Sequence, residues 1–263
     1  MVKVISGKKI AEKVKDKIAQ EIFAFKKRPN LAIILVGSRE DSKLYVSLKE
    51  REGKKVGVDT HLYLLEEKQS EKELIEIIKF LNEDPLIDGI LVQLPLPTKF
   101  NTDKVILSID PEKDVDGFHP QKPDYIKSPV MLAIIACLDE IKMKGENNTA
   151  CIFRNSEVFE KEIKKELGAR GFSFCKNSEA KKADLVITAL GKPQSLKKEI
   201  IKPGAVIIDI GITKTENGVF GDVDFKDVEE KASFITPVPG GIGPMTIAFL
   251  FKNVWEIFKR KTN

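Results

Sequence analysis

Short, mostly apolar runs that alternate with amphipathic stretches constrain the fold of this chain more than any other feature. The runs occupy residues 31–36, 89–94, 183–189 and 205–210. A run of this length without polar alternation is typical of a strand buried on both faces. Helical patterns separate the runs and cover residues 10–25, 44–56 and 71–82. Strands alternating with helices of this length predict an α/β fold with parallel sheets.

The chain length of 263 residues leaves room for two modest domains. Residues 110–129 contain four prolines and little periodicity, so we expect the first domain to end there. A second set of strands follows, near residues 150–153, 173–175, 185–188 and 206–210. The amphipathic segment 245–260 predicts a final helix that packs on the first domain. The predicted domains are therefore residues 1–128 with 246–263, and residues 129–245.

Charge and composition exclude several classes of protein. The 44 basic and 40 acidic residues nearly balance, which argues against a nucleic-acid partner. No apolar run approaches the roughly 18–20 residues that span a bilayer, and the N-terminus lacks the pattern of a signal peptide. We therefore expect a cytoplasmic protein with no membrane partner. Cys137, Cys151 and Cys175 lack metal-ligand spacing, so neither a disulfide scaffold nor a metal site is expected.

Tyr45 and Lys49 form the first candidate site. Four residues apart on a helix, they project from the same face. A lysine that is partly desolvated beside a phenol can exchange protons near neutral pH. On spacing alone, a solvated surface lysine is the commoner interpretation.

Gln93 and the Asp114–Gly117 stretch form two further candidates. Gln93 ends a predicted buried strand, where open α/β sheets bind their ligands, although a core amide satisfied by the backbone is an equal alternative. The two aspartates in Asp-Val-Asp-Gly have two possible uses. They can cap the backbone of a turn. Alternatively, one can present its carboxylate to the amino and ring N–H donors of a heterocycle such as a pterin.

The segment 237–246 is rich in glycine and proline and leads into the last predicted helix. Its glycines allow a close approach of the backbone, and its exposed N–H groups can meet a phosphate or a ring carbonyl. Taken alone, such a turn is weak evidence for a site.

Taken together and in this order, these stretches resemble the bifunctional methylenetetrahydrofolate dehydrogenase/methenyltetrahydrofolate cyclohydrolase family. The resemblance also includes residues 191–193, 201–211 and 221–225. It implies a homodimer of two-domain subunits, each with an N-terminal three-layer α/β domain and a Rossmann-like NAD(P)-binding domain. The substrates would be tetrahydrofolate derivatives and the cofactor NADP. The implied reactions are oxidation of the methylene derivative and hydrolysis of the methenyl product.

The resemblance also assigns roles to individual residues. Lys49 matches the catalytic lysine, Tyr45 the residue that stacks on the folate, Gln93 the partner that tunes the lysine, and Asp116 the aspartate that holds the pterin. Further expected contacts to substrate come from Pro239, Gly240 and Gly241. Expected contacts to the cofactor come from Arg154, Asn155, Ser156 and Ile212. No metal is implied.

The sequence departs from the family pattern in the expected phosphate turn. Phe153 and Phe159 stand where the family has glycines, and Lys161 stands where it has proline. We expect the two rings to fill the space of the dinucleotide phosphates, and Glu160 to oppose them by charge. Arg154 remains available for a 2′-phosphate. Three alternatives follow: the bifunctional enzyme, a cyclohydrolase without dehydrogenase activity, and a non-catalytic folate-binding protein.

Overall fold

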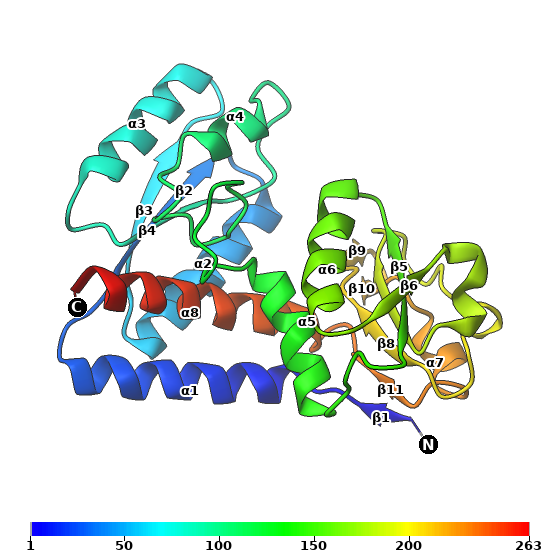
Figure 1. Cartoon of the computed structure of the whole chain (residues 1–263). Helices are drawn as coiled ribbons and strands as arrows, with labels where there is room; N and C mark the ends of the chain where they lie inside the picture. Colours follow the sequence, from blue (N-terminus) through cyan, green and yellow to red (C-terminus); the bar gives the residue numbers. More distant parts are fainter. Residues whose placement is uncertain (1, 263) are drawn as a thin grey trace. The chain divides into compact units, whose positions relative to one another are not determined.

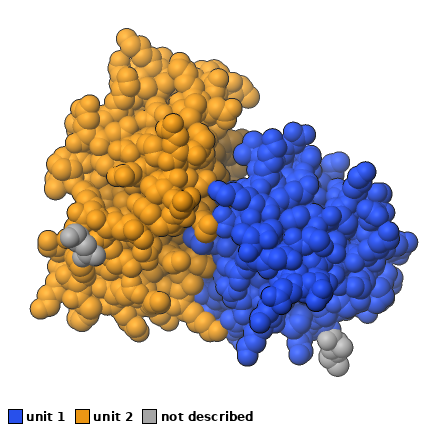
Figure 2. All heavy atoms as spheres, viewed as in Figure 1, with its two compact units in different colours: residues 1–11, 130–246 blue, residues 12–129, 247–263 orange. Residues whose placement is uncertain are grey.

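The computed structural model describes residues 2–262 and divides into two compact units (Figures 1 and 2). Unit 1 comprises Met1–Ala11 and Val130–Thr246, and unit 2 comprises Glu12–Pro129 and Ile247–Asn263. Two of the boundaries fall within long helices, α1 (Gly7–Phe25) and α8 (Ile242–Thr262), and the third falls between Pro129 and Val130.

Unit 2 is built on a parallel sheet with the strand order β3-β2-β4. The strands are β2 (Asn30–Val36), β3 (Asp59–Leu65) and β4 (Gly89–Val92). The connecting helices are α2 (Glu40–Val56) and α3 (Glu71–Glu83), and α4 (Thr102–Leu107) follows β4. The predicted helix over 71–82 is therefore correct to within one residue. Its start is set by a capping box in which Ser70 and Glu73 bond each other's backbone N–H.

Strand β2 explains why unit 2 has three layers. Its odd-numbered side chains, such as Ile33, pack into a core with α1, α2 and α8. Its even-numbered side chains, such as Ile34, pack into a second core with α3 and α4. Burying each such side chain contributes about 1.5–3 kcal/mol, so both faces of the sheet must be covered. This confirms the prediction of a strand that is apolar on both sides.

Helix α8 returns to unit 2, as its amphipathic pattern predicted. Phe251, Trp255 and Phe258 all lie in the core shared with α1 and α2. Trp255 stacks on Phe258, and its Nε1 donates to Glu21 Oε2 of α1 at 2.5 Å. An indole needs such a partner when it is buried.

Unit 1 is built on a second parallel sheet, with the order β1-β11-β8-β7-β5-β6 within the described residues. Its strands are β1 (Lys3–Val4), β5 (Thr149–Arg154), β6 (Ser173–Cys175), β7 (Leu185–Ala189), β8 (Val206–Asp209) and β11 (Phe234–Ile235). A hairpin of β9 (Thr213–Thr215) and β10 (Gly218–Phe220) follows β8.

Helices cover both faces of this second sheet. Figure 1 shows α5 (Pro129–Glu140) and α6 (Glu157–Ala169) on one face and α7 (Phe225–Val228) on the other. Two 3₁₀ helices, η1 (Asn177–Lys182) and η2 (Lys198–Ile200), complete the connections. Helices on both faces make this the doubly wound type of α/β unit.

The N-terminal residues differ from the expected domain organisation. Sequence analysis placed residues 1–128 in one domain, whereas Met1–Ala11 group with unit 1. The reason is β1, which pairs in parallel with β11 through Lys3–Phe234 and Val4–Ile235. A strand this short has no periodicity that a sequence pattern can reveal. Within residues 2–262, no helix is long and apolar enough to cross a membrane.

Phe251 tests the core that α8 completes. Its side chain is fully buried and packs against α2 at Gly53. We expect Phe251→Ala to lower the free energy of unfolding by about 3–5 kcal/mol, through lost burial and a residual cavity. Urea unfolding followed by circular dichroism measures this change. The matched control is Phe23→Ala, since the ring of Phe23 is 86% exposed. A Phe251→Ala variant as stable as the Phe23→Ala variant would contradict this packing.

Candidate active site

Lys49 and Gln93 are brought together in unit 2 although 44 positions separate them. Lys49 lies on α2 and is half-buried, and its Nζ donates to Gln93 Oε1 at 2.8 Å. Gln93, which directly follows β4, is buried, and its Nε2 donates to the carbonyl oxygen of Leu94 at 2.7 Å. The second bond fixes the amide so that its oxygen faces the lysine. Gln93 therefore accepts a hydrogen bond from the lysine in a fixed orientation. The interpretation of Lys49 as a solvated surface residue is wrong.

The two aspartates of the Asp-Val-Asp-Gly stretch make different interactions, so the two uses left open by the sequence fall to different residues. The buried carboxylate of Asp114 accepts the backbone N–H groups of Asp116 and Gly117, each at 3.1 Å, and of His119 at 2.7 Å. Asp114 thus shapes the turn. The carboxylate of Asp116 interacts electrostatically with the Lys49 amine instead.

Asn253 anchors the loop that carries Asp116. This buried α8 residue donates through Nδ2 to the carbonyl oxygens of Val115 and Lys127, both at 2.8 Å. On the preceding side, the N–H of Ile90 donates to the carbonyl of Lys113 at 2.8 Å, which joins the loop to β4. Sequence analysis missed Asn253. The available signal was a polar amide on the apolar side of the final helix.

Burial shifts the pKa values of both charged groups at this site. It lowers the pKa of the Lys49 amine, and the negative charge of Asp116 opposes that shift. It raises the pKa of Asp116 to about 6, an effect that Lys49 opposes and Asp114 reinforces. Near neutral pH the carboxylate is therefore mostly ionised, while the amine loses its proton more readily than an ordinary lysine.

Tyr45 lies one helical turn before Lys49 on α2, and its side chain is 38% exposed. Because residues four apart share a helical face, Tyr45 and Lys49 lie on the same side of α2. The four residues predicted as catalytic thus all belong to unit 2.

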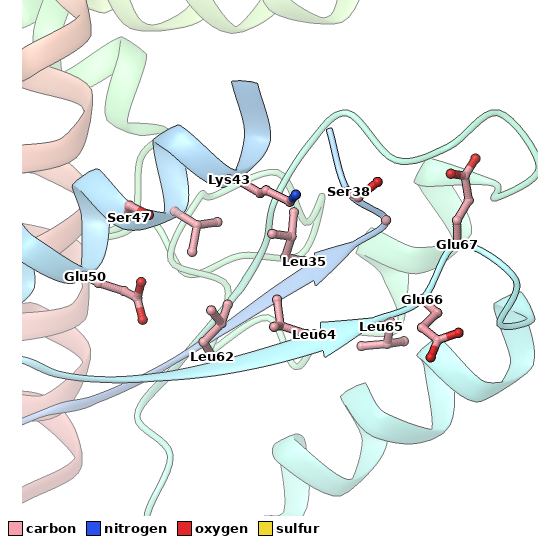
Figure 3. A pocket seen from close by; sticks show the side chains of 12 residues that line it. Leu35, Ser38, Lys43, Ser47, Glu50, Leu62, Leu64, Leu65, Glu66 and Glu67 are labelled. Carbon is pink, nitrogen blue, oxygen red and sulfur yellow. The ribbon is translucent and has the colours of Figure 1, made fainter. Parts of the chain in front are cut away.

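A separate pocket of about 540 Å³ opens between α2 and the edge strand β3 (Figure 3). Leu62 and Leu64 form its floor, and Lys43, Ser47 and Glu50 line it from α2. Lys49 and Tyr45 are not among its lining residues, so this pocket is distinct from the group around Lys49.

The residues expected to bind the cofactor gather in unit 1. Arg154 ends β5, and Asn155 and Ser156 connect it to α6. Ser156 caps α6 by accepting the N–H of Phe159 at 3.4 Å, and the N–H of Asn155 donates to the carbonyl of Ala189 at 3.3 Å. Strand β5 has β6 on one side and β7 on the other. The connection reverses direction here, and doubly wound sheets bind ligands at this point.

The predicted obstruction by Phe153 is wrong. Its ring packs against a cluster that includes Cys151, Ala180 and Val228, whose described members come from elements other than α6. Side chains alternate along a strand, so Phe153 and Cys151 share the face turned away from α6. Phe159 lies half-buried in the first turn of α6. Phe153 therefore leaves the space between the end of β5 and α6 open.

Glu160 is neutralised within unit 1. It accepts Arg154 Nε at 2.5 Å, and Lys164 Nζ lies 2.7 Å from its other oxygen. These ion pairs, which sequence analysis missed, lower the pKa of the Glu160 carboxyl. The four-residue spacing of Glu160 and Lys164 was a usable signal.

The remaining predicted residues also lie in unit 1. Ile212 follows β8 and is 45% exposed. Pro239 is exposed, whereas Gly240 and Gly241 are buried. The carbonyl of Gly240 accepts the N–H of Lys8, and a Cβ on Gly241 would lie 2.5 Å from the carbonyl oxygen of Pro237. A positive φ of 107° at Gly240 and close packing at Gly241 therefore explain locally why each is glycine.

Two buried carboxylates hold the loops at the carboxyl ends of β7 and β8. Asp222 accepts the N–H groups of Leu190 at 2.6 Å and Lys192 at 2.8 Å. Asp209 accepts the N–H groups of Asp222 and Val223 at 3.1 and 2.9 Å. The hydroxyl of Thr188 also donates to Asp222 at 2.9 Å, and the other bonds come from backbone N–H groups, so both carboxylates shape these loops.

Together, the fold and the lysine group define an α/β protein that combines a half-buried lysine, amide and carboxylate in one unit with a second unit of the doubly wound, nucleotide-binding type. A family model for the tetrahydrofolate dehydrogenase/cyclohydrolase catalytic domain matches residues 5–116. The model for the NAD(P)-binding domain of the same family matches residues 129–262. The chain belongs to the tetrahydrofolate dehydrogenase/cyclohydrolase family, which confirms the resemblance seen in the sequence.

Individual relatives agree over nearly the full length. The bifunctional protein FolD of a Nitratiruptor species is 41% identical, and the match covers 98% of each chain. The bifunctional enzyme FolD from Campylobacter jejuni has a solved structure with a TM-score of 0.94, 32% identity and 99% coverage of each chain. The Trypanosoma brucei FolD structure, complexed with NADP and inhibitor, has a TM-score of 0.93 and 26% identity, covering 100% of this chain and 99% of that one.

The raised pKa of Asp116 predicts a pH-dependent stability cost. The carboxyl titrates near 3.8 when unfolded and at about 6 when folded, so wild type loses stability as the pH rises through about 6. Asparagine does not titrate. The stability of Asp116→Asn relative to wild type should therefore increase by about 1–3 kcal/mol from about pH 4.5 to about pH 7.5. Urea unfolding at several pH values measures this difference.

The control for this experiment is Asp41→Asn. Arg39 holds the pKa of Asp41 at about 2, so this carboxyl is ionised throughout the range. Its stability difference from wild type should stay flat with pH. An equally flat difference for Asp116→Asn would show that Asp116 is not desolvated.

Proposed function

We propose that this enzyme oxidises 5,10-methylenetetrahydrofolate with NADP and hydrolyses the 5,10-methenyl product to 10-formyltetrahydrofolate. One observation carries the proposal: the half-buried Lys49 amine, which bonds Gln93 and is coupled to Asp116. Family membership along nearly the whole chain supports the pair of activities.

Lys49 acts as the general base of the hydrolytic step. Water adds to the carbon of the cationic methenyl bridge, and the neutral amine takes the proton that this water loses. The bond from that carbon to N5 then breaks as the added hydroxyl loses its proton to become the formyl oxygen and N5 gains a proton, which leaves the formyl group on N10 with net release of one proton. A protonated lysine would repel this cationic substrate, so the lowered pKa of Lys49 suits the role.

The neighbours of Lys49 position both the amine and the substrate. Gln93 accepts a hydrogen bond from the amine and so directs the nitrogen lone pair. Asp116 presents an ionised carboxylate to the amino and ring N–H groups of the pterin. Tyr45 offers a partly exposed aromatic ring on which the folate stacks. We assign Pro239, Gly240 and Gly241 to further substrate contacts, with Pro239 the most accessible of the three.

The residues at the carboxyl ends of β5, β7 and β8 fit a dinucleotide. A Cβ on Gly191 would have no atom within 4 Å, so the backbone after β7 is open to a ligand. Arg154, Asn155 and Ser156 follow β5, and Ile212 follows β8. When bound, NADP supplies the hydride acceptor for the methylene carbon. The protein's contribution to this step is orientation of the two reactants.

We propose that the enzyme works in the cytoplasm as a homodimer on tetrahydrofolate derivatives, without nucleic-acid or membrane partners. The family resemblance supports the dimer, and the balanced charge supports the absence of a nucleic-acid partner. Sedimentation equilibrium of the purified chain tests the dimer, and a monomer at micromolar concentration would contradict it.

Replacement of Lys49 tests the hydrolytic role. We expect Lys49→Ala to slow hydrolysis roughly 100- to 10,000-fold, because the general base is removed. Loss of methenyl absorbance at neutral pH, corrected for the uncatalysed rate, measures this. Lys43→Ala is the control on the same helix, since Lys43 is exposed and paired only with Glu40 among the described residues. Hydrolysis that survives in Lys49→Ala would remove the assigned role.

The dehydrogenase half is tested separately. Wild type mixed with methylenetetrahydrofolate and saturating NADP should form NADPH, followed by its absorbance, with an NADP-free reaction as the control. Because the ring of Phe153 packs into a core on the face turned away from α6, we expect a signal well above that control. Hydrolysis without NADPH formation would instead indicate an enzyme with cyclohydrolase activity alone.

A further inference from the structure

A second pocket, of about 370 Å³, opens in unit 1 at the carboxyl ends of β5 and β6. Arg154 lines it from the end of β5, and Glu160 and Lys164 line it from α6. Lys176, the residue after β6, completes its charged lining among the described residues. Among the described residues, its charged lining is thus three cations and one carboxylate.

The carboxylate of Glu160 pairs with two of these three cations, Arg154 and Lys164. One oxygen lies 2.5 Å from Arg154 Nε and the other 2.7 Å from Lys164 Nζ. Only 20% of the Glu160 side chain and 33% of the Arg154 side chain are exposed. The guanidinium is therefore already engaged by an anion that belongs to the protein itself. Glu157, the other acidic residue near Arg154, lies 4.0 Å away and is 77% exposed.

The position of the pocket indicates what it binds. In doubly wound sheets, an acidic residue at the end of the second strand, about 20 residues after the first turn, holds the 2′-hydroxyl of NAD. A nearby arginine instead accommodates the 2′-phosphate of NADP. Here β6 is that second strand, and Lys176 and Asn177 follow it in place of an acidic residue. Within the described part of the chain, the only carboxylate lining the pocket comes from Glu160 on α6.

We infer that Glu160 is a specificity-determining residue, a built-in counter-ion that the 2′-phosphate of NADP must displace from Arg154. This inference rests on the proposed use of NADP. A phosphate monoester carries nearly two negative charges at neutral pH, so it cannot share Arg154 with an ionised carboxylate without repulsion. Glu160 therefore weakens the binding of NADP, while NAD, which presents a neutral 2′-hydroxyl, is little affected. Lys164 and Lys176 remain as cations that favour the phosphate once Glu160 has turned away.

The test compares nucleotide affinities of wild type and Glu160→Gln by isothermal titration calorimetry. Glutamine keeps the shape of the side chain and removes its charge. We expect the Kd of NADP to fall about tenfold and the Kd of NAD to change less than about twofold. Glu157→Gln is the matched control: it removes one negative charge from the same helix turn and should change the NADP affinity less than about twofold.

The possible outcomes separate this inference from the proposed function. If wild type binds NADP and Glu160→Gln binds it no more tightly, the counter-ion role is overturned while NADP use stands. If both affinities rise equally in Glu160→Gln, the effect is not on the 2′-phosphate and the inference also fails. If neither protein binds NADP, the inference and the cofactor half of the proposed function fall together. Lys176→Gln should weaken NADP alone, which adds independent support.

Discussion

The group of polar residues around Lys49 in unit 2 depends on the desolvation of a single amine, that of Lys49 itself. Lys49 is held in a half-buried position, so its proton is less tightly bound than that of a surface lysine. The same burial raises the pKa of Asp116, and each group limits the shift of the other. Burying the two charges costs stability, although their mutual attraction recovers part of that cost. The structure offsets this cost with the fully packed cores on either side of β2.

Much of unit 2 could be predicted from the sequence because its elements are long and periodic. The helix from Glu71 and the strand from Asn30 begin within one residue of their predicted starts. The motifs also singled out Lys49, Gln93 and Asp116, which interact in the structure. The sequence could not show which of Asp114 and Asp116 bonds the backbone of the turn, because either carboxylate could do so. Only the structure shows that Asp114 accepts these N–H groups. The pairing of β1 with β11 was equally hidden, since it joins two-residue strands more than 200 positions apart.

The altered phosphate turn shows where comparison by motif alone misleads. Two phenylalanines in place of glycines suggested a blocked site, yet the face on which a strand residue lies decides what its side chain fills. Phe153 lies on the side of Cys151 and joins an existing core. Charge, rather than volume, is the more consequential change at this turn, because Glu160 engages the guanidinium of Arg154.

The anchoring of the Asp116 loop by Asn253 has a consequence for biosynthesis. The amide of Asn253 reaches back 138 positions to the carbonyl of Val115, and α8 also fills the core between α1 and α2. A nascent chain that has emerged only as far as the second sheet lacks α8, and therefore lacks both the Asn253 hydrogen bonds and the packing of that helix. Asp116 therefore reaches the position seen in the structure only after the last helix has been synthesised.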